Sequence, residues 1–352
     1  MRCPLALWPP LFVRNTDAGR FLESFLVSGV AAVLGIRVYL ELAGYPQLGG
    51  RGLHIAHMLW GGLLMTLALI LLLAFLGRRV QHLAAIIAGL GFGTFIDELG
   101  KFITSDNNYF FQPTIALIYV IFVLLFLGFR ILQQRQLSPE ECLLNGLDLV
   151  KEVLLQADAP ARRDQALLLL RASGSRLPLV SALEAALQQL AIAPSKRGVL
   201  AILESRLRAV YHRVVAWRWF HRAVEVVFVV HATFFIVFTL GLIVFDPQFT
   251  LTDPHLSVAD AGQLFASVLS SLLIVVGVLT LFRSRLAAYH WFRRAILVSI
   301  FLIQVFAFYT EQLAALVGLA VDLVLLAALD YMIQEEQRRV TAQLLLAAPS
   351  RP

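Results

Sequence analysis

The chain has 352 residues, of which 59% are hydrophobic and 15% are charged, and its mean hydropathy is +0.78. This composition excludes an ordinary soluble globular protein and is typical of a chain that crosses a membrane several times. The net charge of +6 does not indicate nucleic-acid binding, because the polar part of the chain has no basic stripe with interleaved aromatic residues.

Apolar runs of about 20 residues recur along the chain, and each is long enough to cross a hydrocarbon core of roughly 30 Å as a helix. They predict an all-α, polytopic membrane bundle of about eight transmembrane helices. The expected spans are 22–44, 54–77, 81–101, 113–132, 223–245, 259–281, 291–309 and 311–333. Seven spans is the competing count, because the third run is the least distinct and the last two share a very short turn.

The spans divide the chain into five expected parts. These are an N-terminal segment 1–21, a first four-helix membrane half 22–132, a helical insert 133–220, a second four-helix half 221–333 and a C-terminal tail 334–352. Arginines accumulate on the side of the membrane that carries both termini and the insert, which identifies this side as cytoplasmic. We therefore expect a multi-pass protein of the plasma membrane with cytoplasmic N- and C-termini.

The insert opens with SPEE at 138–141, a capping box with proline at the first helical position. An apolar stripe then predicts an amphipathic helix; it consists of Leu143, Leu147, Val150 and Leu154. Further helices are expected at 161–172, 178–192 and 197–220. The insert is interpreted as a small linker domain that packs on itself or on the membrane face, or alternatively as a docking module for a cytoplasmic partner.

The two membrane halves show traces of an internal repeat. RFLESFLVSGV, which leads to the loop YPQL, has a counterpart in RAVEVVFVVHA, which leads to DPQF. FIDELGKF and FYTEQLAAL also occupy the same place in their halves. Because many transporters contain duplicated bundles, these matches favour a 4+4 parallel repeat around the insert.

Charged residues end the third span, in the sequence GFGTFIDELGKFITSDNNYFFQP at 91–113. Residues four apart share a helix face, so one stripe contains Ala85, Gly89, Gly93, Asp97 and Lys101. Its lower part has the small-xxx-small pattern that lets another membrane helix approach closely. Its upper part predicts an ion pair between Asp97 and Lys101, turned into the bundle.

Helical rise places ionisable residues of the first three spans at a similar depth near the outer surface. The second span begins LHIAHMLWGG, so its two histidines lie one turn apart. The predicted outer pocket or ion-binding layer comprises Arg37, Glu41, His54, His57, Asp97, Glu98, Lys101 and, in the loop SDNNYFFQ, Asp106. Local pairs of Arg37 with Glu41 and Asp97 with Lys101 would make it structural, whereas ionisable groups inside a membrane usually mark function.

A divalent metal such as zinc is one hypothesis for this layer, with His54, His57 and Glu98 as ligands. HxxH is a common spacing, and HExxH, in which the glutamate has a catalytic role, is absent. The histidine pair with nearby carboxylates resembles metal-dependent membrane hydrolases such as the alkaline ceramidases. The serine and the carboxy-terminal histidine pair of that family have no counterpart in this chain.

A second set of polar residues lies at mid-depth in the other half: His231, Gln304 and Asp322. An unpaired charge at the depth of Asp322 would cost several kcal/mol, so this acid is expected to be protonated or paired. A proton relay and a hydrogen-bonded structural acid are both consistent with that position.

Three functions follow as hypotheses. The first is transport of a cation or small polar solute, coupled to protons through Asp322 and His231. The second is a metal-dependent intramembrane hydrolase, and the third is a sensor or scaffold that signals through the insert. The expected partners are the lipid bilayer, a solute or ion and a cytoplasmic protein, with self-association left open. No P-loop, Rossmann fingerprint or GxSxG motif occurs in the sequence.

Overall fold

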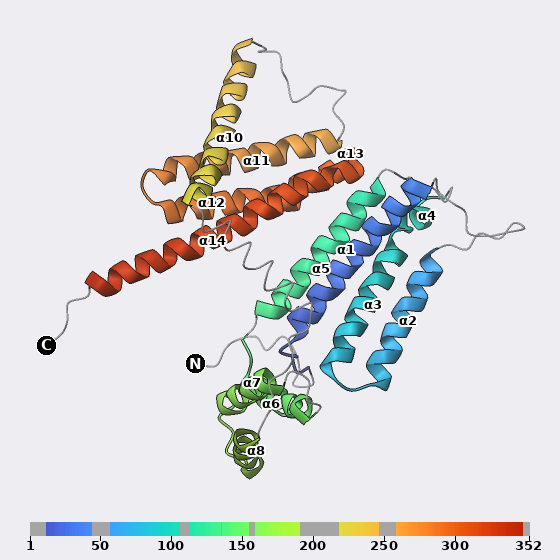
Figure 1. Cartoon of the computed structure of the whole chain (residues 1–352). Helices are drawn as coiled ribbons and strands as arrows, with labels where there is room; N and C mark the ends of the chain where they lie inside the picture. Colours follow the sequence, from blue (N-terminus) through green and yellow to red (C-terminus); the bar gives the residue numbers. More distant parts are fainter. Residues whose placement is uncertain are drawn as a thin grey trace, which may run out of the picture. The chain divides into compact units, whose positions relative to one another are not determined.

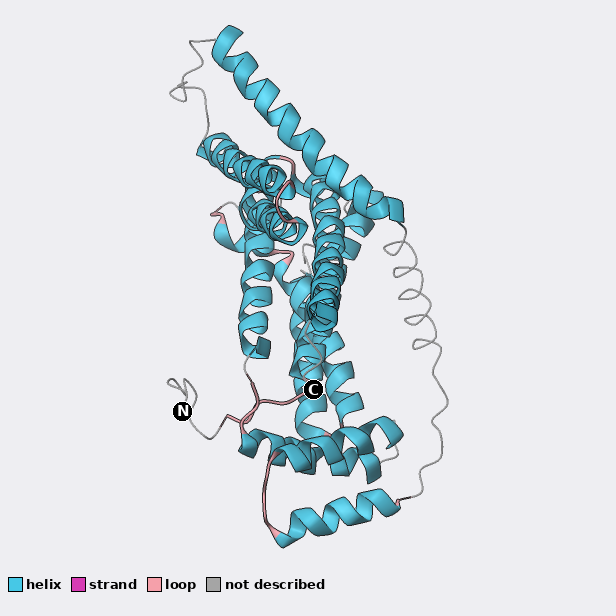
Figure 2. Cartoon of the chain, turned by 90° about the vertical axis from the view of Figure 1, so that its left-hand side faces the viewer, coloured by secondary structure: helices cyan, strands magenta, loops and turns pink. Residues whose placement is uncertain are grey.

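The computed structural model describes residues 12–43, 57–105, 111, 113–134, 136–154, 159–190, 218–245 and 258–347. Within these ranges the chain is helical and contains no strand (Figure 2), which confirms the predicted all-α class. His54, Asp106, the loops YPQL and DPQF, and most of the expected helix 197–220 lie outside the described residues.

Seven of the described helical segments are long and apolar enough to cross a membrane, which confirms a multi-pass bundle. They are Ala18–Ala43, His57–Ala74, Arg78–Ile96, Pro113–Gln134, Ala259–Leu281, Arg285–Thr310 and Gln312–Arg338. The expected fifth span lies within α10 (Arg218–Phe245), which is not among these seven. Residues 226–245 of α10 nevertheless contain no Asp, Glu, Lys or Arg, so the prediction of eight spans is kept.

The chain divides into two compact units, of which unit 1 comprises residues 1–109 and 121–197. Its helices are α1 (Ala18–Ala43), α2 (His57–Ala74), α3 (Arg78–Ile96), α4 (Leu99–Ile103), most of α5 (Pro113–Gln134), α6 (Pro139–Leu154), α7 (Ala159–Ala172) and α8 (Pro178–Gln189). The third helix, α3, lies between α1 and α2 and packs against both (Figure 1).

Glycines allow these helices to approach closely. A side chain at Gly89 or Gly93 would overlap backbone or side-chain atoms of α1 around Phe25 and Gly29. On the other side of α3, a Cβ on Gly61 of α2 would lie 2.6 Å from the carbonyl oxygen of Gly91. The small-residue stripe therefore forms a tight helix contact, as its sequence pattern predicts.

The insert begins with the predicted capping box. The Glu141 carboxylate accepts from the Ser138 N–H at 2.9 Å, and the Glu141 N–H donates to the Ser138 hydroxyl at 3.1 Å. The expected apolar stripe is shifted, because α6 buries its core at Cys142, Leu149 and Val153, whereas Leu154 is exposed. The buried face also carries Glu141, Asn145 and Glu152, whose polarity hides that face from a hydropathy pattern.

Unit 2 comprises residues 110–120 and 198–352. Its helices are α10, α11 (Val258–Leu281), α12 (Arg285–Val298), the π-helical turn η1 (Ser299–Ile303), α13 (Gln304–Thr310), the 3-10 turn η2 (Gln312–Ala314) and α14 (Ala315–Ala347). Phe228 of α10 and Phe292 of α12 stack in its core with ring centroids 4.3 Å apart. The first turns of α5 also belong to this unit, where Ile115 and Ala116 pack against Phe308.

The two halves share one irregularity at the two motifs, which is not predicted from the sequence. FIDELGKF interrupts the helix after Ile96, and FYTEQLAAL interrupts it after Thr310, and each break is followed by a short helical turn. The parallel repeat stays a prediction, because the two loops that carry its other matches lie outside the described residues.

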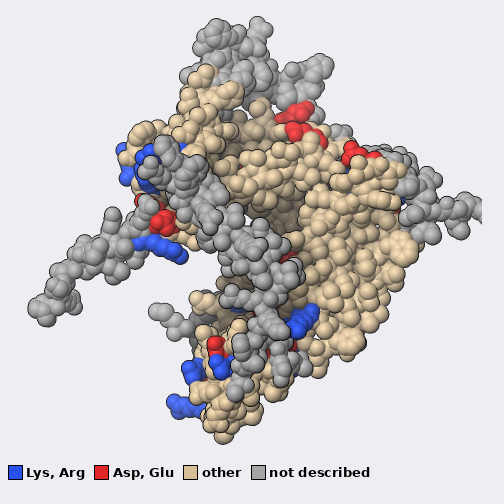
Figure 3. All heavy atoms as spheres, in the orientation of Figure 1, with Lys and Arg blue, Asp and Glu red and all other residues tan. Residues whose placement is uncertain are grey.

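Charged side chains are unevenly distributed on the face shown in Figure 3. They gather over the insert and near helix ends, while the broad face of the unit 1 spans carries few charged residues. Large apolar side chains of these spans, such as Leu63, Leu73 and Leu124, are exposed. This distribution fits spans that lie in lipid.

Candidate functional site

Five ionisable side chains meet at the end of unit 1 that lies opposite the insert. This Asp97 cluster consists of Arg37 from α1, His57 from the start of α2, Asp97 and Glu98 from the turn between α3 and α4, and Lys101 from α4. The tight packing of α3 against α1 and α2 brings these three elements together. Of the predicted outer layer, the structure connects these five residues, whereas Glu41 lies outside the cluster.

Asp97 is fully buried and bridges two helices. The Arg37 Nε donates to its Oδ1 at 2.6 Å, and the His57 Nε2 lies 3.2 Å from its Oδ2. A buried guanidinium–carboxylate pair is a strong, charge-assisted interaction. Asp97 therefore fastens α1 and α2 to the end of α3.

Glu98 has a different environment, although it is equally buried. Its Oε1 lies 2.9 Å from the Lys101 Nζ and 3.0 Å from the His57 Nδ1. Its Oε2 is buried and has no hydrogen-bond partner among the residues that the structure describes. Since buried polar atoms normally have partners, this oxygen is an unsatisfied acceptor inside the cluster.

The ion pairs differ from the local pairs expected from the sequence. Arg37 pairs with Asp97 on another helix, whereas Glu41 is exposed and makes no ion pair among the described residues. Lys101 pairs locally with Glu98, because the helix breaks after Ile96 and Lys101 belongs to the next helical turn. Position on a single helix cannot predict the pair of Arg37 with Asp97.

The described residues contain no group of three or more His, Cys, Asp or Glu side chains that could hold a metal ion. Both ring nitrogens of His57 face carboxylate oxygens, so neither is directed at an open ligand position. His54 lies outside the described residues, and the zinc hypothesis is therefore untested.

A second buried acid lies in unit 2. Asp322 of α14 is 8% exposed, and its Oδ2 accepts from the Ser299 Oγ at 2.7 Å and from the Gln304 Nε2 at 3.0 Å. These three residues form the Asp322 site. The sequence predicts Gln304 and Asp322 as members of one polar set, and the structure brings them into contact.

The π-helical turn η1 shapes this site. The Gln304 N–H donates to the carbonyl of Ser299, five residues back, instead of to Ile300. The Ile300 carbonyl accepts from the Tyr119 hydroxyl at 2.6 Å. Residues five apart lie about 140° apart around an α-helix, but the wider π-turn brings Ser299 and Gln304 to the same acid. Such single π-turns occur frequently at functional sites.

His231 does not contact the Asp322 site. It is exposed on α10, and its Nε2 lies 3.3 Å from the Ser271 hydroxyl on α11. A direct relay between His231 and Asp322 therefore has no hydrogen-bond path among the described residues. The expected relay set is reduced to Asp322 and Gln304.

A third polar cluster, the insert junction, joins the insert to the membrane helices of unit 1. Arg78, at the start of α3, pairs with Asp17 before α1 and with Asp148 of α6, and Asp17 also pairs with Arg162 of α7 at 2.8 Å. The Arg78 N–H donates to buried Glu152 at 2.9 Å. The insert is thus held to the ends of α1 and α3 by buried and partly buried polar contacts.

These contacts set the charge of the junction. Burial alone would raise the pKa of Asp17, but the hydrogen bonds and positive charges of Arg78 and Arg162 outweigh it and hold that pKa below its ordinary value of 3.8. Burial likewise opposes the lowered pKa of Asp148, which Lys151 and Arg78 produce. Both aspartates are therefore ionised at neutral pH.

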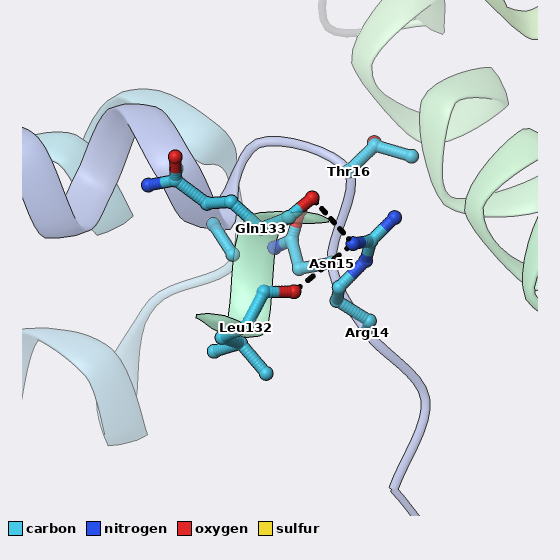
Figure 4. A pocket seen from close by; sticks show the side chains of 7 residues that line it. Arg14, Asn15, Thr16, Leu132 and Gln133 are labelled. Atoms are coloured by element: carbon cyan, nitrogen blue, oxygen red, sulfur yellow. Dashed lines mark hydrogen bonds between the residues drawn. The ribbon is translucent and has the colours of Figure 1, made fainter. Parts of the chain in front are cut away.

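A small pocket lies beside the junction, where α5 ends and α1 begins (Figure 4). The Arg14 guanidinium donates to the carbonyl oxygens of Leu132 and Gln133 at 3.0 Å each, which satisfies the end of α5. Asn145 of α6 donates to the Arg14 carbonyl and accepts from the Thr16 N–H. The segment before α1 is thereby fixed between α5 and the insert.

Sequence reasoning missed Ser299, Tyr119, Asp17 and Arg78. The arginines near the ends of the spans predict only the orientation of the chain in the membrane. Arg78, however, is 3% exposed and lies at the centre of the junction. A serine inside an apolar span gives no signal by itself, and a π-turn has no sequence signature. No protein-family model, curated protein or solved structure matches the chain.

Proposed function

We propose that the protein is a transporter of the plasma membrane that moves a cation or small polar solute, coupled to protons. In this proposal both termini and the insert are cytoplasmic, and the Asp97 cluster faces outward. The hydrophobic helices, buried acids at the end of one membrane-length segment and within another, and the trace of a repeat support it.

The single observation that carries the proposal is the state of Glu98. Its carboxylate is buried, and its Oε2 has no partner among the described residues, while the neighbouring His57 and Lys101 are 21% and 23% exposed. A cation or a donor group that entered beside these two side chains would satisfy that oxygen. Since buried polar atoms normally have partners, the unsatisfied acceptor supports a binding role for Glu98.

Uptake into proteoliposomes tests this role. The probes are Na⁺, K⁺, Mg²⁺, Mn²⁺, Zn²⁺ and small primary amines, each offered with and without an inward proton gradient. We expect Glu98→Gln to reduce uptake of the transported probe roughly tenfold or more, since a hydrogen bond to a charged group contributes about 1.5–3 kcal/mol.

The matched control is Glu41→Gln, which alters an exposed acid of α1 and should leave uptake at the wild-type rate. Equal uptake by wild type and Glu98→Gln, for every probe that the wild type moves, would refute a role for Glu98 in solute binding. Absence of uptake for all probes in the wild type would refute transport of these classes.

The insert junction favours a sensor as the second candidate function. Because Arg78 and Asp17 begin helices whose other ends carry Asp97 and Arg37, α1 and α3 link the outer cluster to the insert. Deleting residues 138–195 should abolish signalling while leaving ligand binding outside intact. Signalling by the deletion variant would exclude this role for the insert.

A further inference from the structure

We propose that Asp322 is the proton carrier of this protein, and that Ser299 and Gln304 stabilise it in both of its protonation states. This inference rests on the proposed function for its purpose, because it names the group that couples protons to transport. The proton site itself can be tested without any transport measurement.

The position of Asp322 requires a neutralising partner. It lies ten residues into the 27-residue segment Gln312–Arg338, roughly 15 Å from that end, which is the middle of a hydrocarbon core. No Lys, Arg or His side chain among the described residues contacts it. A buried carboxylate without a cationic partner binds a proton more readily than it remains charged.

The partners of Asp322 suit both states of the acid. A serine hydroxyl and a glutamine amide can each donate to a carboxylate or accept from a carboxylic acid, whereas arginine and lysine can only donate. In the structure both groups donate to Oδ2, the arrangement for a carboxylate. The same arrangement directs the amide NH₂ of Gln304 at Asp322, which disfavours a metal ion beside this carboxylate.

Gln304 also has the group that the protonated state needs. Its Oε1 is buried and has no hydrogen-bond partner in the described part of the chain. If the amide turns over, Oε1 accepts from the protonated carboxyl of Asp322 and the Ser299 hydroxyl is released to rotate. A Cβ at Gly318, one helical turn before Asp322, would lie only 3.0 Å from the Gln304 Nε2, so glycine leaves room for this movement.

Other titratable groups near the site are engaged elsewhere. Tyr119 donates its hydroxyl to the Ile300 carbonyl. On the helices packed against α14, His231 contacts Ser271, Glu225 accepts from Tyr289, and Arg293 pairs with Asp330. None of these described side chains is a cationic partner of Asp322. A proton is therefore the group that would neutralise its charge.

Infrared difference spectroscopy of protein in lipid, recorded while the pH is changed from about 4 to 10, tests this assignment. The carboxylic-acid carbonyl band reports protonated Asp and Glu side chains. We expect one such band to disappear with rising pH in the wild type and to be missing in Asp322→Asn. Asp330→Asn, on the same helix in a half-exposed ion pair with Arg293, is the matched control and should retain the band.

Gln304→Leu provides a second, independent variant. Loss of a partner that serves both states should shift the band in frequency and change its midpoint, and Ser299→Ala should do the same to a smaller extent. A band that is unchanged in Asp322→Asn, or the absence of any titrating band in the wild type, would overturn the assignment. A band lost in Asp322→Asn without any proton-coupled uptake would instead refute the transport proposal and leave the proton site standing.

Discussion

Asp97 and Asp322 are both buried aspartates, but their positions and their partners differ: Asp97 directly follows a membrane-length segment, and Asp322 lies within one. Asp97 is bonded to the guanidinium of Arg37, which is a permanent positive charge and can only donate. Asp322 is bonded to a hydroxyl and an amide, which are neutral and can either donate or accept. We infer that a permanent cationic partner keeps a buried acid charged, whereas neutral partners allow it to exchange a proton.

The backbones around the two acids differ in the same sense. Asp97 follows a helix held by glycine contacts in which backbone atoms nearly touch. Asp322 faces a π-turn, where one carbonyl has already exchanged its intrahelical partner for the Tyr119 hydroxyl. We interpret the first region as a rigid framework and the second as the adaptable one.

Removing the Arg37 guanidinium is expected to have the largest effect on stability. Asp97 would then lack the cationic partner that distinguishes it from Asp322. Arg37→Ala leaves a fully buried carboxylate short of its cation and should lower the free energy of unfolding by about 3–5 kcal/mol. Thermal unfolding in detergent measures this, with Glu41→Ala as the control on the same helix. Asp97→Asn in the Arg37→Ala background should restore part of the loss, and a failure to do so would show that burial of the charge is not the cause.

Adding one methyl group sharpens the contrast between rigid and adaptable regions. Gly61→Ala places a Cβ against the backbone of α3 and should destabilise unit 1 by about 1–3 kcal/mol. Gly62→Ala, the neighbouring residue with open space around its Cα, should be neutral or slightly stabilising. Gly318→Ala meets only the movable end of Gln304 and should cost less than Gly61→Ala, as judged by thermal unfolding. Equal costs at all three glycines would contradict the contrast.

Acid should weaken the insert junction, with the smallest effect of the three. A carboxylate whose folded pKa is depressed stabilises the folded state above its ordinary value and loses that contribution as the pH falls through the folded value. Docking through Asp17 and Asp148 should therefore weaken below about pH 3.8, by less than about 1 kcal/mol because the pairs are partly exposed. Pepsin cleavage of the insert should increase in that range.

Asp17→Asn should show the increased pepsin cleavage of the insert already at about pH 5 and should respond less to further acid. Asp164→Asn alters an exposed acid of α7 and should behave like the wild type. Identical pH profiles for wild type and Asp17→Asn would exclude Asp17 as the group that holds the insert.

The class of the fold could be predicted because an apolar run of sufficient length along the sequence is enough to indicate a membrane-spanning helix. The stripe of Gly89, Gly93 and Asp97 also indicated a buried helix face, since a single helix determines which residues share it. To predict a pair between two helices, one must know how each helix is rotated and how deep it lies, and the sequence does not give this. For this reason the sequence predicts a pair of Arg37 with Glu41 on the same helix. The SPEE capping box was predicted correctly because both of its partners lie within four residues of each other.

The rest of the site depends on features that leave no local pattern. The π-turn has one more residue than a turn of α-helix, and this brings Ser299 next to Asp322. Nothing in the sequence SIFLI predicts a π-turn. The polar residues Asn145 and Glu152 sit on the buried face of α6 because that face meets the segment before α1 and the start of α3. Hydropathy alone assigns such residues to the surface.

Potential-driven proton entry into proteoliposomes tests directly whether Asp322 is the proton carrier. A K⁺ gradient with valinomycin makes the lumen negative, and an enclosed pH-sensitive dye records acidification in the presence of the transported probe. We expect acidification of the lumen with wild type and with Asp330→Asn. With Asp322→Asn the rate of acidification should fall to that of protein-free liposomes. Acidification by Asp322→Asn at the wild-type rate would contradict Asp322 as the proton carrier.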